Sequence, residues 1–111
     1  MPTSTLFVGI DTSLKTNQAC AINFNQDTFF NKSFDNSPSG TEQLTLRILD
    51  VFNKHKELKN LIFCMEATNV YHIHVSSILA NEFRFQPYDC KVYVQNAKLI
   101  EKYKDTFMDR S

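Results

Sequence analysis

Two apolar runs in this chain each end in a carboxylate. Residues 6–11 read LFVGID and residues 61–66 read LIFCME. Such runs are typical of buried strands. A carboxylate at the edge of a buried strand is costly unless a hydrogen-bond donor or a metal ion uses it. If the two strands are neighbours, Asp11 and Glu66 lie together at one rim of a sheet, which is the beginning of a divalent-metal site for phosphoryl transfer.

Length and composition bound the class of protein. With 111 residues, of which 42% are hydrophobic and 22% charged, the chain has room for one globular domain. Twelve basic and twelve acidic residues cancel, so charge alone does not hold nucleic acid to the whole protein. Three widely spaced cysteines argue against a disulfide framework. No apolar stretch approaches the ~20 residues that span a bilayer. We expect a soluble, cytoplasmic protein with no membrane partner.

The first half of the chain predicts an antiparallel beginning to the sheet. The strand of residues 6–11 is followed by a run in which apolar residues alternate from Cys20 onward. After a turn at residues 25–27, another run extends over residues 28–34. Two such runs joined by a short turn predict a β-hairpin. The first strand is then the natural centre of the sheet, between the hairpin and the strand that ends at Glu66.

Two helices with apolar stripes are predicted between the later strands. Residues 35–40 (DNSPSG) break the strand pattern, and Thr41 is expected to cap a helix that ends near His55. The apolar stripes consist of Leu44, Ile48, Val51 and Phe52 in the first helix and Tyr71, Val75, Ile78 and Leu79 in the second. A loop, a fifth strand and the start of a third helix are then expected over residues 84–89, 90–94 and 97–103.

A strand meander followed by alternating helices and strands describes a mixed α/β sheet, with right-handed crossovers between its parallel strands. Such sheets bind ligands at the C-terminal ends of parallel strands, where Asp11 and Glu66 are expected. One or two carboxylates can hold Mg²⁺ while phosphate oxygens complete its shell, and paired metals stabilise the attacking and leaving oxygens of a phosphodiester displacement. Alternatively, both carboxylates only cap the turns that follow. Thr12 and Ser13 could contact a phosphate or satisfy backbone groups.

Three sequence blocks resemble the N-terminal domain of the DEDD transposases of the insertion-sequence 110 family. They read VGIDTSLK at residues 8–15, EATNVYH at residues 66–72 and VQNAKLI at residues 94–100. Their order and separations match the family, and the glutamate block is the most specific. The resemblance implies a RuvC-like, ribonuclease-H-like fold in which four acidic residues bind a divalent metal and act on DNA strands. Asp11 would be the first of these residues and Glu66 the second.

The resemblance also implies the partners of the full protein. It implies a metal-dependent DNA transposase or recombinase that uses Mg²⁺ or Mn²⁺, binds DNA and is guided by a structured RNA encoded by its element. We also expect a homo-oligomer. Lys98 and Lys102 lie four residues apart on one face of the expected third helix, and we predict that they contact phosphates.

The end of the sequence departs from the family. The last two acidic residues of the family lie in a Lys-Thr-Asp-x-x-Asp-Ala block after the helix of Lys98, and this sequence has no such block. Asp105 and Asp109 lack its flanking residues and are not assigned these roles. We therefore expect residues 1–111 to be a single RuvC-like domain that is truncated at its C-terminal end, and the fragment alone to be inactive.

Other functions stay open on the sequence. The main alternative is a non-catalytic nucleic-acid-binding or assembly module that keeps the ribonuclease-H-like fold. An actin-like ATPase is disfavoured because no glycine-rich phosphate loop follows Asp11. A zinc site is disfavoured because His72 and His74, two apart on a helix, face different ways, and Cys64 or Cys90 would have to complete it.

Overall fold

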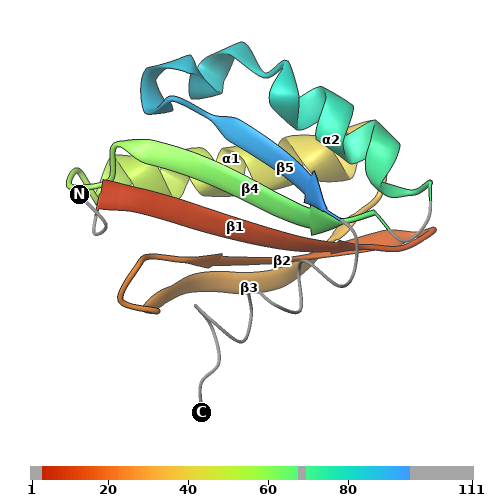
Figure 1. Ribbon diagram of the computed structural model, residues 1–111, viewed down its shortest axis with the longest axis horizontal. Helices are drawn as coiled ribbons and strands as arrows, with labels where there is room; N and C mark the ends of the chain where they lie inside the picture. The colour runs from red at the N-terminus through yellow and green to blue at the C-terminus, as the bar shows by residue number, and fades with distance from the viewer. Residues whose placement is uncertain (1–3, 68–69, 96–111) are drawn as a thin grey trace.

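The chain is described by a computed structural model that covers residues 4–67 and 70–95. Its strands form one five-stranded sheet in the order β3-β2-β1-β4-β5 (Figure 1). The strands are β1 (Thr5–Thr12), β2 (Thr16–Ile22), β3 (Thr28–Asp35), β4 (Asn60–Glu66) and β5 (Lys91–Gln95). The predicted central position of the first strand is confirmed.

The sheet combines an antiparallel half with a parallel half. β1, β2 and β3 pair antiparallel as a meander, while β4 runs parallel to both β1 and β5. The predicted hairpin between the second and third strands is present. This arrangement of a meander and parallel strands confirms the mixed α/β, ribonuclease-H-like class.

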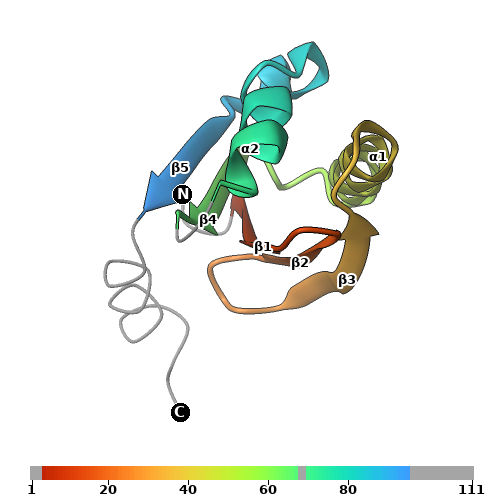
Figure 2. The ribbon, with the colours of Figure 1, turned by 90° about the vertical axis from the view of Figure 1, so that its right-hand side faces the viewer.

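Two helices cover one face of the sheet and leave the other face without a helix among the described residues (Figure 2). They are α1 (Pro38–Lys54) and α2 (His72–Ala80). The apolar stripe of each helix packs on the sheet, because Leu44, Ile48, Val75 and Leu79 are all buried in the core. Each strand of the central pair contributes alternate side chains to this core: Leu6, Val8 and Ile10 from β1, and Leu61, Phe63 and Met65 from β4.

The start of α1 differs from the sequence prediction, which placed the cap at Thr41. Ser37 is the N-cap, and its Oγ accepts a hydrogen bond from the backbone N–H of Gly40 at 3.0 Å. Pro38 occupies the first turn, where its missing N–H costs nothing. The helix therefore begins inside the segment predicted as a break, and Thr41 is buried within it.

The segment predicted as a loop over residues 84–89 is mostly a 3₁₀ helix, η2 (Phe83–Tyr88). Glu82 caps it by accepting a hydrogen bond from the backbone N–H of Arg84. Arg84 also pairs with Glu82 at 2.7 Å and with Glu42 of α1 at 2.6 Å. The hydrogen bonds from Arg84 lower the pKa of Glu82 to about 2. These contacts fasten η2 to α1 and thereby fix the approach to β5.

The chain contains two glycines, and their surroundings predict opposite responses to alanine. A Cβ at Gly40 would collide with the backbone carbonyl of Asp35, whereas a Cβ at Gly9 meets nothing within 4 Å. We expect Gly40→Ala to lower the free energy of unfolding by roughly 1–3 kcal/mol, since backbone must shift to admit the methyl group. Gly9→Ala should leave it unchanged or raise it by roughly 0.4–1 kcal/mol. Urea titration compares the two, and equal losses of stability would contradict the close approach at Gly40.

Candidate functional site

The parallel pairing of β1 with β4 carries the two predicted acidic residues to the same end of the sheet. The Cα partners run in register from Thr5 and Asn60 to Ile10 and Met65. Asp11 and Glu66 are the residues that follow this last pair. In Figure 1, β1 and β4 run in the same direction and end at the same end of the sheet.

Figure 2 shows α1 and α2 on one face of the sheet, and the alternation of buried residues along β1 and β4 places Asp11 and Glu66 on the other face. The residues that precede them, Ile10 and Met65, are 4% and 1% exposed and belong to the core under the helices. Since successive side chains of a strand point to opposite faces, the two carboxylates point away from that core. Asp11 is exposed and Glu66 is half buried. Neighbouring strands lie about 4.8 Å apart, so the two carboxylates project from adjacent strands on the same face of the sheet.

The strand register extends this pair into a row of polar residues. β1 pairs Asp11 with Gln18, β2 pairs Gln18 with Ser33, and β4 pairs Glu66 with Gln95. Across the sheet the row therefore reads Ser33, Gln18, Asp11, Glu66 and Gln95. The sequence analysis missed Gln18, Ser33 and Gln95, because only the register of the strands aligns them with the carboxylates.

Hydrogen bonds hold one end of this row in place. Gln18 Nε2 donates to Asn31 Oδ1 at 2.6 Å, and Ser33 Oγ donates to Gln18 Oε1 at 2.8 Å. The amide of Gln18 is thereby fastened to β3. Its second N–H is not used by these two bonds. The neutral end of the row is thus rigid beside the acidic pair.

Open space adjoins the acidic pair at Gly9. In the register this glycine lies between Cys20 of β2 and Cys64 of β4, on the same face as Asp11. A Cβ built at Gly9 has no neighbour within 4 Å. A glycine inside a strand often marks a place where a ligand or another backbone approaches the sheet closely. The bare backbone at Gly9 therefore leaves room for a substrate next to the carboxylates.

The two carboxylates are not neutralised by an ion pair within the described residues. The basic side chains there that form ion pairs, Lys54, His55, Arg84 and Lys91, pair with other acidic residues. Across residues 4–67 and 70–95, no group of three or more His, Cys, Asp or Glu side chains could hold a metal ion. The described part of the site is therefore a pair of carboxylates, and the zinc alternative finds no support in that part.

The turn after Asp11 is closed by Ser13. Ser13 Oγ donates to the carbonyl oxygen of Thr16 at 2.7 Å, and the backbone N–H of Ser13 donates to the same oxygen at 2.9 Å. Thr12 is 8% exposed and faces the helices. Ser13 thus satisfies the backbone groups of this turn. Because Ser13 closes the turn after β1, a capping role for Asp11 is not needed to explain that turn.

Cys20, Cys64 and Cys90 form no disulfide bond among the described residues. Burial raises the pKa of Cys20, and burial together with the charge of Asp89 raises the pKa of Cys90 to about 11. Cys64 is half buried in β4. Since the thiolate is the nucleophile and the metal ligand, Cys20 and Cys90 are poorly suited to covalent chemistry.

Comparison with known proteins gives the family. The sequence matches the family described as Transposase (DEDD_Tnp_IS110) over residues 8–111. The chain belongs to this transposase family. No curated protein matches it. Membership agrees with the ribonuclease-H-like sheet and with the three sequence blocks, and it implies DNA as the partner.

Several predicted features of this transposase-family chain fall outside the described residues. Lys98, Lys102 and the third helix expected at residues 97–103 lie there, so their predicted roles stay predictions. Within the described ranges, no helix combines the length and the apolar character that crossing a membrane requires.

Proposed function

We propose that this domain supplies two of the metal-binding carboxylates of a DNA transposase that cleaves and transfers DNA strands. Asp11 and Glu66 are the proposed ligands of Mg²⁺ or Mn²⁺. The observation that supports this proposal best is the parallel register of β1 and β4, which carries both residues to one end and one face of the sheet. Membership of the transposase family supports the reaction class.

The donor set suits a hard divalent cation. Mg²⁺ takes oxygen ligands, retains several waters, and is commonly held by one or two carboxylates together with substrate phosphates. The two carboxylates have no ion-pair partner among the described residues, so binding a cation does not require that an existing ion pair be broken. In the described part of the chain, no group of three or more His, Cys, Asp or Glu side chains that could hold zinc forms around them. The residues present therefore fit the metal that the family implies.

Each part of the site then has a task. A divalent cation bound here would supply charge stabilisation to a phosphodiester at the moment of displacement. Asp11 and Glu66 hold that charge on two hydrogen-bonded central strands, which keep their spacing fixed. Gly9 admits the substrate backbone to the face of the sheet. Gln18, which lies next to Asp11 in the row and is fastened by Asn31 and Ser33, has a second amide N–H that these bonds leave unused.

The wider assembly is part of the proposal. Lys98 and Lys102 would contact phosphates of DNA, and a structured guide RNA and further copies of the protein would complete the working complex. Cys20, Cys64 and Cys90 form no disulfide with one another, which supports work in the reducing cytoplasm. The alternative, a non-catalytic nucleic-acid-binding or assembly module, is favoured by the presence of only two clustered carboxylates among the described residues.

Removal of either proposed ligand should abolish specific metal binding. We expect Mn²⁺ to bind the 111-residue chain at one weak site, and Asp11→Asn or Glu66→Gln to weaken that binding roughly tenfold or more, because each replaces a charged ligand by a neutral amide. Calorimetric titration with Mn²⁺ measures both. Glu57→Gln, which removes an equal charge from an exposed position, is the matched control. If all three variants bind alike, the paired-carboxylate site is wrong.

The isolated chain should not process DNA. Two carboxylates position a metal poorly, and misplacement of reacting groups by ~1 Å costs ~10²-fold in rate. We expect no cleavage and no joining of supercoiled or linear DNA by the 111-residue chain in Mg²⁺ or Mn²⁺, as followed by gel electrophoresis. Robust cleavage that Asp11→Ala abolishes would show that the metal site is already complete in this chain.

A further inference from the structure

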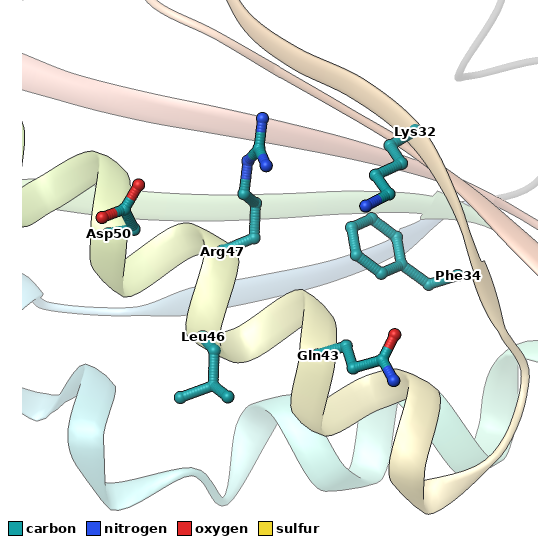
Figure 3. A pocket seen from close by; sticks show the side chains of 6 residues that line it. All are labelled: Lys32, Phe34, Gln43, Leu46, Arg47 and Asp50. Carbon is teal, nitrogen blue, oxygen red and sulfur yellow. The ribbon is translucent and has the colours of Figure 1, made fainter.

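A second feature of the molecule lies on the opposite side of the sheet from Asp11. An open hollow of about 350 Å³ separates edge strand β3 from α1 (Figure 3). It is lined by Lys32, Phe34, Gln43, Leu46, Arg47 and Asp50. Lys32 lies two residues from each of the buried Phe30 and Phe34 along β3, and residues two apart in a strand share a face. It therefore projects from the face that the helices cover. The hollow therefore shares no residue with the carboxylate site.

Two cations border this hollow from opposite walls, and each rests on an aromatic ring. Lys32 Nζ is 5.7 Å from the ring centroid of Phe34, and Arg47 Cζ is 5.5 Å from that of Phe30. Both rings are 5% exposed and form part of the core. A ring attracts a cation without neutralising it. The contacts therefore restrain the two side chains while their charge stays available.

Neither cation has a carboxylate partner within the described residues, although other bases there do. Arg84 is neutralised by Glu42 and Glu82, and Lys91 by Asp89 at 2.8 Å. Asp50 is the one acidic residue that lines the hollow, and its carboxylate pairs with Lys54 at 3.3 Å. The hollow thus combines two positive charges with one acidic residue, Asp50, whose carboxylate is paired with Lys54.

We propose that this hollow binds a phosphodiester group of a nucleic-acid backbone between Lys32 and Arg47. The ammonium and guanidinium N–H groups are the donors that commonly fix phosphates, and the amide of Gln43 adds another donor to the lining. The hollow is open to solvent, as a continuous strand passing over it requires. Contacts of this kind position nucleic acid without reading its sequence. The site would hold DNA or RNA away from the carboxylates, as an anchor.

A purely protective role explains only half of the arrangement. Lysines on edge strands prevent strands of two molecules from pairing, and β3 is an edge strand with Lys32 on it. This does not account for Arg47, which comes from α1 and faces the same space from the other wall (Figure 3). Two cations from separate elements, neither paired with a carboxylate of the described residues, line this hollow, which favours an anion site.

The test is binding of fluorescein-labelled DNA and RNA oligonucleotides to the 111-residue chain by fluorescence anisotropy, across a series of salt concentrations. We expect the double variant Lys32→Gln, Arg47→Gln to bind single strands roughly tenfold more weakly at low salt. The magnitude of the slope of log K against log salt should fall by about 0.7, which is the contribution of one lost phosphate contact on a single strand. Parallel titrations with DNA and with RNA of the same sequence show which backbone the site prefers.

Two further double variants serve as controls for the charge removed from the hollow. Lys56→Gln, Lys59→Gln removes the same charge from exposed positions between α1 and β4 and should leave the slope unchanged. Lys32→Arg, Arg47→Lys retains both charges and should therefore keep the salt slope of the original chain. The proposal is overturned if the original chain binds neither oligonucleotide, or if both charge-removing variants weaken binding equally. Loss of Mn²⁺ binding on Asp11→Asn tests the carboxylate site separately, so failure of one proposal does not imply failure of the other.

Discussion

The parallel pairing of β1 with β4 is the interaction on which the rest of this structure depends. It joins the antiparallel meander to the helix-connected half of the sheet, and each strand gives three nearly fully buried side chains to the core. A slip of one residue in either strand would turn its core residues to the opposite face. The burial of Leu6, Val8 and Ile10 therefore fixes the register, and the register places Asp11 beside Glu66. Core packing and site geometry have one cause.

Much of this arrangement could be predicted from the sequence because the strands are strongly patterned. The apolar runs that end at Asp11 and Glu66 marked both central strands, and the alternation after Cys20 marked the hairpin. Local capping chemistry was harder to predict. Ser37 and Pro38 together outcompete Thr41 as the start of α1, because the proline fits the first turn and the serine satisfies the N–H of Gly40. The predicted placement of the strands relative to one another was correct, whereas the predicted start of α1 was wrong.

Features that depend on long-range register were not visible in the sequence. Gln18 and Gln95 align with the carboxylates only once β2 and β5 are paired with their neighbours. Likewise, Lys32 and Arg47 are far apart in the sequence and line the same hollow only because α1 packs beside β3. Within the described residues, the sheet thereby has an acidic pair on one face and two cations without a carboxylate partner on the face that α1 and α2 cover. This separation is hidden in a formal net charge of zero.

The central claim is that one cation is shared by the ends of β1 and β4, and paramagnetic broadening of backbone amide signals by Mn²⁺ tests it most directly. At substoichiometric Mn²⁺, the account predicts that the amide resonances of Asp11 and Glu66 broaden together. The resonances of Gln18 and Gln95, their neighbours in the row, should broaden next. Those of α1 should persist. Broadening at only one of the two strand ends, or diffuse broadening over exposed acidic residues such as Glu57, would contradict the account.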